Sequence, residues 1–504
     1  NINEAAQILD QFKKDEYRAV DYVAVLQTQA KLFAIQGLFD DAEDNLNAAS
    51  KLLRRVENTV VFDELAAGEE LSSLNITLGR YSDTEELLTT LINNYQSRYG
   101  SQSRKLINPL VNRGHLELIT GDYPKAEKTA QKAFQLASQV FDEKSSKPAP
   151  PLILLSEVYT SIGDYTKAED NIMKAIAIQK EQFGSNHVDV GKSLAQLGLI
   201  KFHKGDQLNE VETIMDDALR IIENILGNRN PTYASLLTDR AKVYISDKRY
   251  DDAFNSLNLA EKIWVARVGR RNNINAAAIF TLVGDLYYLQ RQYSLAETEY
   301  EKSKKLYEQF FNRNHPEYVK ILSKLSKVYF MEGNGKLAIK NIEEALANYQ
   351  NFIRDYFPAL SEREKAKYWN TIKSDYEFYN TLAFINKGTD PSLVGYVYNN
   401  ALLTKAILLN SSIKIRERIQ NSTDAELKAQ YNSWLEKKEY LTNVLSMSIE
   451  QLSENSIDPV ALANEVEAIE KELSQKSELF SQSFDDKRIE WINVQQVLKP
   501  NEVA

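Results

Sequence analysis

The 504-residue sequence contains no cysteine and only four histidines. Without thiols it can form no disulfide, no thiolate metal site and no cysteine nucleophile, and the histidines lack the spacing of a zinc-binding motif. Glycine and proline are also scarce, at 18 and 11 residues, so we expect a folded, helix-rich chain rather than a disordered one. No apolar run approaches the ~18 residues that would suggest a membrane span.

Positive charge is in the minority, with 61 Lys and Arg against 71 Asp and Glu and a formal net charge of -10. This balance argues against a general binder of nucleic-acid phosphates. The sequence starts at Asn1 rather than at Met, which favours a processed or trimmed start. A cleaved export signal would explain it, and so would trimming of a longer chain. Because the absence of cysteine fits both a reducing cytosol and an envelope compartment, composition leaves the location open.

Small residues recur eight times at intervals of 42 or 43 residues, and this period is the main feature of the chain. They are Ala30, Ser72, Gly114, Ser156, Gly198, Ala241, Gly284 and Ser326. A turn position follows seven residues later, occupied by Gly37, Gly79, Gly121, Gly163, Gly205, Lys248, Arg291 and Gly333. A fixed period of this size predicts a solenoid whose units stack on their neighbours and present an extended binding surface.

The third repeat shows how each unit is expected to fold. Residues 110–119 form one helix, and the turn at residues 121–124 ends it. Small and apolar residues at helical spacing then mark a second helix: Ala126, Ala130, Ala133, Leu136 and Ala137. Gly114 and Ala126 are small because two antiparallel helices approach closely only where both lack bulk.

This pattern resembles the tetratricopeptide repeat (TPR), in a 42-residue form similar to that of kinesin light chains and bacterial adaptor proteins. Repeats of that form often begin with an Asn-His-Pro-like start, matched here by Asn186-His187, Asn230-Pro231 and Asn314-His315-Pro316. The resemblance implies an all-α, right-handed α-solenoid of about eight helical hairpins over residues 1–352. It also implies that a protein or peptide partner binds the concave surface.

Helical patterning continues after the repeats, without their period, through a connector at residues 353–490. Ser361 and Glu364 have the spacing of a capping box, and Thr423 and Glu426 suggest a second one. Asp458-Pro459 starts a further helix, whose short coiled-coil-like apolar stripe is Leu462, Val466, Ile469 and Leu473. We expect this region to form a helical hairpin.

The tail resembles the region that precedes the caspase-like CHAT peptidase domain in TPR-CHAT proteins. The matching segments are Phe357–Glu364, Trp369, Tyr398–Leu409 and Trp491–Glu502. The resemblance implies that residues 491–504 start a peptidase domain attached in cis, whose catalytic residues lie beyond Ala504. No catalytic residue can be carried over, so the chain itself is not expected to be an enzyme. The location stays open between the bacterial cytoplasm and, if a signal peptide is removed, the cell envelope.

Several polar side chains occupy the positions that face the inner groove in TPR helices. They are Asn112, His115, Gln196, Asp239, Lys242, Lys320, Lys324 and Lys327. The three lysines of the eighth repeat follow i, i+4, i+7 spacing, so they share one helix face. They are interpreted either as a binding site for an acidic peptide or as a solvated charged face.

Three functional hypotheses remain open from the sequence. The first is the recognition and regulatory region of a CHAT-type protease. In it, a partner that binds the concave surface moves the connector and thereby restrains or releases the peptidase. The second is a free-standing adaptor that assembles protein complexes, and the third is a sensor of a peptide pheromone. None of them calls for a cofactor, a metal ion, nucleic acid or a membrane span.

Overall fold

The computed structural model describes residues 16–56, 65–141, 145–269, 273–357, 360–402, 419–479 and 490–499. Throughout these ranges the chain forms helices and turns and no β-strand, so the predicted all-α fold of stacked hairpins is confirmed. The chain divides into two compact units, Asn1–Val328 (unit 1) and Tyr329–Ala504 (unit 2). Each unit is described by itself.

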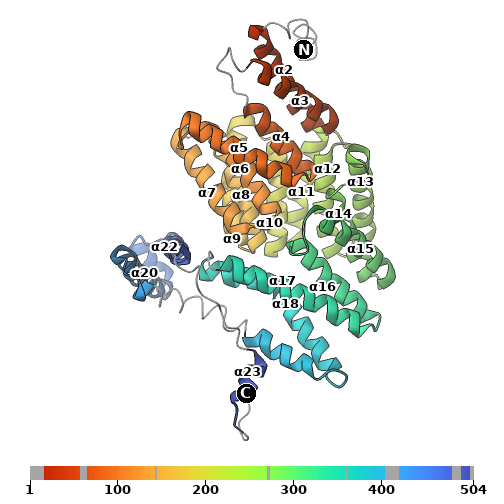
Figure 1. The fold of residues 1–504 in the computed structure, drawn as a ribbon, viewed down its shortest axis with the longest axis vertical. Coiled ribbons are helices and arrows are strands. Elements are labelled where there is room, and N and C mark those ends of the chain that lie inside the picture. The colour runs from red at the N-terminus through yellow and green to blue at the C-terminus, as the bar shows by residue number, and fades with distance from the viewer. Residues whose placement is uncertain are drawn as a thin grey trace. The chain divides into compact units, whose positions relative to one another are not determined.

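Unit 1 contains seven consecutive helical hairpins, in which each first helix packs on the second (Figure 1). The hairpins are α2 (Glu16–Gln36) with α3 (Phe39–Val56), α4 (Leu65–Leu78) with α5 (Tyr81–Tyr99), α6 (Ile107–Ile119) with α7 (Tyr123–Val140), α8 (Ala149–Ile162) with α9 (Tyr165–Phe183), α10 (Val188–Lys204) with α11 (Leu208–Leu226), α12 (Pro231–Ser246) with α13 (Tyr250–Val268), and α14 (Asn275–Leu289) with α15 (Tyr293–Phe310). A short 3-10 helix, η1 (Arg104–Leu106), precedes α6, and α16 (Pro316–Met331) starts in unit 1 and ends in unit 2.

Small residues allow close helix packing, as the sequence predicts. A Cβ atom on Gly114 would lie 2.4 Å from Leu154 Cδ2, and one on Gly284 would lie 2.6 Å from the Tyr300 ring. Ala126, at the facing position of the third repeat, is completely buried. Leu154 belongs to the next hairpin, so Gly114 allows close packing between hairpins as well as within one.

The turn between the two helices of a hairpin requires a left-handed backbone. The turn glycines have positive φ, for example +87° at Gly121 and Gly163. Lys248 and Arg291 hold the same conformation at φ 62° and 61°, although they carry side chains. The turn geometry therefore persists where the sequence lacks the residue best suited to it.

Unit 2 begins within α16 and continues with α17 (Gly335–Tyr356) and α18 (Glu362–Asn386). Two hydrogen bonds join α17 to α18: Tyr349 Oη donates to Asp375 Oδ2 at 3.0 Å, and Tyr379 Oη donates to Glu343 Oε1 at 3.1 Å. The remaining described helices of unit 2 are residues 392–402, α20 (Ala425–Leu445), α21 (Ile449–Glu454), α22 (Pro459–Leu479) and α23 (Trp491–Val497).

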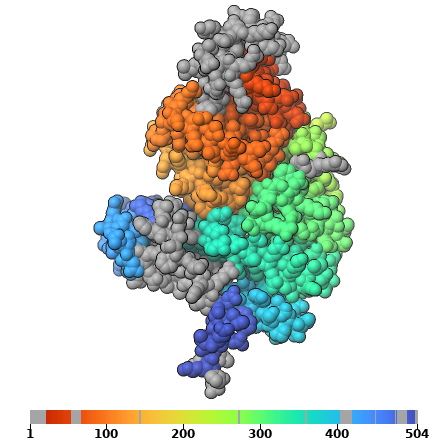
Figure 2. Space-filling model, in the orientation of Figure 1, coloured from red at the N-terminus to blue at the C-terminus, as the bar shows by residue number. Residues whose placement is uncertain are grey.

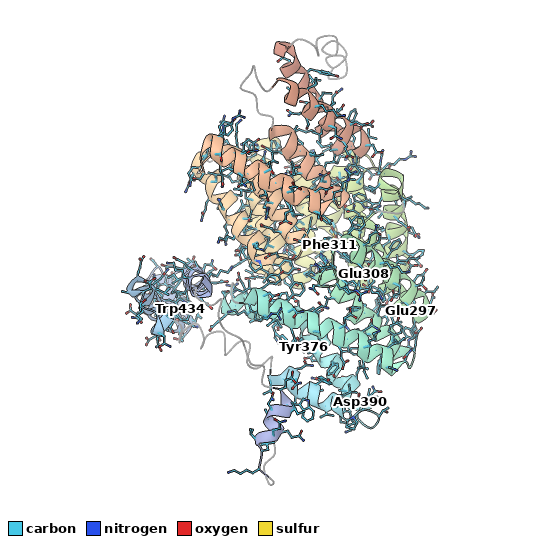
Figure 3. The ribbon with its side chains drawn as sticks, viewed as in Figure 1. Glu297, Glu308, Phe311, Tyr376, Asp390 and Trp434 are labelled. Carbon is cyan, nitrogen blue, oxygen red and sulfur yellow. The ribbon has the colours of Figure 1, made fainter. Side chains whose placement is uncertain are left out.

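Helices α20 and α22 form the predicted hairpin of the connector. Their apolar faces share one buried cluster: Leu427, Tyr431, Trp434, Val466 and Leu473 (Trp434 is labelled in Figure 3). The predicted apolar stripe along α22 is therefore confirmed at Val466 and Leu473, and Ile469 packs against the same cluster.

Of the three helix caps predicted in unit 2, the structure has two at the predicted residues and one at a neighbouring residue. Ser361 forms both bonds of a capping box with Glu364, and Asp458 caps α22. The cap expected at Thr423 is wrong: the carboxylate of Asp424 accepts the backbone N–H groups of Glu426 and Leu427 instead. One acceptor atom, Oδ1, thus satisfies two free donors of the first turn.

Parts of the tail segments lie outside the described residues. These are residues 358–359, residues 403–409 of the Tyr398–Leu409 segment, and residues 500–504 of the last one.

Candidate functional site

Contacts between hairpins far apart in the sequence close unit 1 on itself. The Nδ2 group of Asn230, at the start of α12, donates to the carbonyl of Ile35 at the end of α2, at 2.7 Å. The Nδ2 group of Asn275, at the start of α14, donates to the carbonyl of Thr77 at 3.3 Å. In Figure 2 the orange segment around residue 100 and the green segment around residue 300 meet directly. We call these contacts the seam.

The third seam contact involves His315, directly before α16. Its Nδ1 accepts the backbone N–H of Glu317 at 3.2 Å, so Nε2 carries the ring proton and donates to the carbonyl of Ile119 at 2.7 Å. Burial lowers the pKa of His315, which favours this neutral form. The predicted role of His315 at a helix start is confirmed, and the same ring also contacts a carbonyl at the end of α6.

Aromatic rings fill the seam beside these hydrogen bonds. Phe311, which is labelled in Figure 3, stacks on Tyr81 with centroids 4.8 Å apart and on His315 with centroids 4.0 Å apart. A Cβ atom on Gly79 would lie 2.7 Å from the Phe310 ring, so the turn of the second repeat and the end of α15 are in contact. The contact between distant hairpins therefore combines polar and apolar interactions.

Inside unit 1 lies a cavity of about 1090 Å³, lined mainly by first helices of the hairpins. Its wall includes Lys31, Glu70, Glu157, Lys192, Gln196, Ser235, Asp239, Lys242 and Glu317, together with Asn230, Asn275 and His315 of the seam. Side chains from α2, α4, α8, α10, α12 and α16 thus face one space.

Most of the charged groups in the wall are paired. Lys31 binds Glu70 at 2.9 Å and Lys242 binds Asp239 at 2.7 Å. Glu157 and Glu317 have partners just outside the wall, His115 at 3.2 Å and Lys320 at 2.6 Å. Among the described residues, Lys192 is the charged wall residue without an ion pair.

Three residues predicted for the groove line the cavity: Gln196, Asp239 and Lys242. Asn112 does not, because its Nδ2 donates to Ser72 Oγ at 2.9 Å and to the Glu69 carbonyl at 3.1 Å, which joins α6 to α4.

His115 lies behind the wall on α6, with its Nδ1 3.2 Å from Glu157 Oε2. Burial alone would lower the pKa of His115. The negative charge of Glu157 and its hydrogen bond outweigh that effect, and the pKa is raised.

The three lysines predicted to share one face of the eighth repeat do not form a single site in the structure. Lys320 holds Glu317 of the wall, whereas Lys324 Nζ donates to Asp285 Oδ1 on α14 at 2.6 Å. Neither Lys324 nor Lys327 lines the cavity.

Sequence reasoning missed Lys192 and the seam. Lys192 lies four residues before Gln196 on α10, so helical spacing alone could have placed the two on one face. The seam joins residues 195 to 198 positions apart, and the repeat pattern does not state how many hairpins complete one turn of the solenoid.

Other kinds of site find no support in the described part of the chain. No group of three or more His, Asp or Glu side chains is arranged to hold a metal ion there. None of the helices in the same ranges is long and apolar enough to cross a membrane.

The fold and the cavity together define a class, an α-solenoid of stacked helical hairpins whose first helices surround an inner space. Family models described as tetratricopeptide repeat match residues 149–182 and 275–351. Residues 149–182 and 275–351 are thus tetratricopeptide repeats.

The solved structures to which this chain is similar share little sequence with it. A Rap protein complexed with Competence and Sporulation Factor is 14% identical, with a TM-score of 0.50, covering 78% of this chain and 99% of its own. A putative kinesin light chain from Podosopora anserina is 16% identical, with a TM-score of 0.32, covering 40% of this chain and 95% of its own. A STAND protein with a tetratricopeptide-repeat sensor from Pyrococcus horikoshii is 14% identical, with a TM-score of 0.40, covering 70% of this chain and 53% of its own. The comparison with curated proteins gave no match.

Proposed function

We propose that unit 1 binds an extended peptide segment in its inner cavity and so acts as a recognition module. The observation that carries this proposal is the cavity of about 1090 Å³, whose wall combines apolar, uncharged polar and charged side chains from successive repeats. This volume is slightly larger than the roughly 300–1,000 Å³ typical of ligand pockets.

The seam favours an extended segment over a folded partner. Because Asn230, Asn275 and His315 hold the ends of α2, α4 and α6, the inner surface is not an open concave face. A folded domain would have to break these contacts to reach the cavity wall, whereas a single extended chain would not.

A random peptide library displayed with free C-termini, selected against the whole chain, tests the proposal. Enriched peptides are then synthesised and their affinities measured by fluorescence anisotropy. Ser235 is exposed and lines the cavity, so Ser235→Trp places an indole ring in the space that the peptide would occupy. We expect Ser235→Trp to abolish binding of the enriched peptides.

The control is Lys128→Trp, which adds the same ring at an exposed position of α7 outside the cavity wall. It should leave binding unchanged. A selection that enriches no peptide, or peptides that bind Ser235→Trp as tightly as the unaltered chain, would overturn the proposal. Binding of a folded protein with the same indifference to Ser235→Trp would favour the adaptor hypothesis instead.

A second function, regulation of an attached caspase-like peptidase, is supported by the tail sequence alone. In this proposal residues 1–352 form the repeat array, residues 353–490 the connector, and residues 491–504 the start of the peptidase domain. The segments that carry it are Phe357–Glu364 and Trp491–Glu502. Sequencing the gene beyond the codon for Ala504 tests it, because a continuation into any other fold would exclude it.

A further inference from the structure

Helices α20 and α22 of unit 2 form a hairpin with an apolar core of its own. The buried cluster inside the hairpin holds Ile419 and side chains of α20 and α22, and no described residue of α17 or α18 belongs to it. Tyr368 of α18 packs instead on Phe357, with ring centroids 6.0 Å apart. Moving the hairpin away from α18 would therefore leave its apolar core whole.

Hydrogen bonds join this hairpin to the start of α18. Ser361 Oγ donates to Glu467 Oε1 of α22 at 2.7 Å. The backbone N–H of Glu362 donates to Glu470 Oε1, one turn further along α22, at 2.8 Å. Two carboxylates of α22 thus accept donors from the first turn of α18, where backbone N–H groups have no partner within their own helix.

Two ion pairs link the same elements. Lys438 of α20 binds Glu362 at 2.9 Å, and these side chains are 40% and 39% exposed. Lys471 of α22 binds Glu364, which is completely buried, at 2.6 Å. Ion pairs return little net free energy because each charge loses its water, but reversing one charge of a pair turns attraction into repulsion.

A buried cation next to Glu364 opposes this attachment. Lys365 is 1% exposed, and its Nζ makes no hydrogen bond within the described structure. Burial lowers the pKa of Lys365, and the carboxylate that counteracts this effect most strongly is Glu470 of α22. Since water would solvate the ammonium group again if α22 moved away, the attachment is a balance of opposing charge effects.

We propose that the α20–α22 hairpin is a movable module, which docks on the start of α18 or leaves it as a folded unit under the control of charge. Release exposes polar and charged groups, which water solvates, while the apolar cluster around Trp434 stays closed. Salt, or a charged partner that competes for Glu362 and Lys438, favours the released position. This conformational switch is independent of the peptide cavity in unit 1.

Spin labels on the whole chain measure the two positions. Because the sequence has no cysteine, Asn370→Cys on α18 and Ser433→Cys on α20, both exposed, give one defined pair of labels. At low salt we expect one main distance. Raising NaCl from about 0.1 M to about 1 M shortens the screening length from ~10 Å to ~3 Å and should add a second, broader population.

Charge reversal in the labelled chain tests the junction itself. Lys438→Glu and Glu362→Lys each bring like charges together and should shift the ratio of docked to released molecules about tenfold toward release. The double variant restores an opposite pair and should recover the main distance. The matched control is Lys437→Glu, because Lys437 pairs with Glu465 inside the hairpin, at 2.6 Å, and its reversal should leave the distance unchanged.

Helix content distinguishes movement from unfolding. The released variants should keep their circular dichroism signal, and the backbone amides beside Trp434 should keep slow hydrogen exchange. Unchanged distances in both single variants, or no recovery in the double variant, would overturn the proposal. Release accompanied by loss of helix would overturn it as well, because the contacts would then stabilise the helices themselves rather than dock them.

Discussion

Lys248 and Arg291 occupy turn positions where six other repeats have glycine. Their φ angles of 62° and 61° lie in the left-handed region, where a side chain costs about 1 kcal/mol or more. Both side chains are exposed, and neither makes a hydrogen bond, ion pair or ring contact within the described structure. The two residues are thus strained without a compensating interaction.

Replacement of either residue by glycine should therefore stabilise unit 1. We expect Lys248→Gly and Arg291→Gly each to raise the free energy of unfolding by about 0.5–1 kcal/mol, measured by urea denaturation. The control is Gly205→Ala, at φ 88° with open space around the added Cβ, which should lose about 1 kcal/mol. Loss of stability in the two glycine variants would show that the turn is not strained.

His115 makes the stability of unit 1 depend on pH. Its pKa is higher in the folded chain than its ordinary value of 6.5, so the ion pair with Glu157 stabilises the fold fully below about pH 6.5. That contribution is lost as the pH rises through the raised pKa. His115→Gln should thus cost about 0.5 kcal/mol at pH 6 and little at pH 9, measured by chemical denaturation.

Glu157→Gln is the matching control for the same pair. It removes the charge that raises the pKa of His115 and should flatten the pH dependence in the same way. A difference between His115→Gln and the unaltered chain that grows with rising pH would contradict this account.

At the scale of single elements, the start of α18 depends on Ser361. Its Oγ accepts the N–H of Glu364 at 3.2 Å and donates to Glu467 Oε1 on α22 at 2.7 Å. Lys471 of α22 also binds Glu364, at 2.6 Å. The capping box therefore starts α18 and also joins it to α22.

Ser361→Ala should destabilise unit 2 by about 2–3 kcal/mol, because it removes a cap and a hydrogen bond to the buried carboxylate of Glu467. Ser448→Ala provides the control, since Ser448 forms a capping box on α21, an exposed helix of six residues. That change should cost about 1 kcal/mol or less. Equal losses in the two variants, measured by hydrogen exchange across unit 2, would refute the link to α22.

The helices were largely predictable because their signals are local. Periodic apolar positions, turn glycines and caps such as Asp458 act within a few residues of one another. The error at Thr423 arose because Asp424, one residue later, is an equally good cap and sits where the backbone needs it. Propensity and spacing could not choose between two adjacent cap residues.

At the scale of the whole of unit 1, the seam should control access to the cavity. Asn230→Asp and Asn275→Asp keep the side-chain shape and the cap of Asn230 but place a carboxylate oxygen against the carbonyls of Ile35 and Thr77. We expect the double variant to lose about 1–3 kcal/mol per site and to open the seam, with helix content unchanged by circular dichroism.

The absence of cysteine allows this opening to be measured directly. Spin labels on Gln36→Cys and Asn228→Cys, both exposed positions beside the first seam contact, report the distance across it. Asn171→Asp is the control, since Asn171 bonds to Lys167 of its own helix away from the seam. A distance distribution that matches the unaltered chain in the double variant would show that the seam does not depend on these amides.

The sequence by itself determined the repeat, its helices and turns, and the inner face on which Gln196, Asp239 and Lys242 lie. These follow from periodicity, since each is fixed by residues close together in the chain. Only the tertiary structure decided that Asn230, Asn275 and His315 meet carbonyls 195 to 198 residues away. It also decided that Lys192, among the described residues, has no ion pair while the other charged wall residues do. Small rotations between successive hairpins add up along the array, and that sum decides which distant side chains meet.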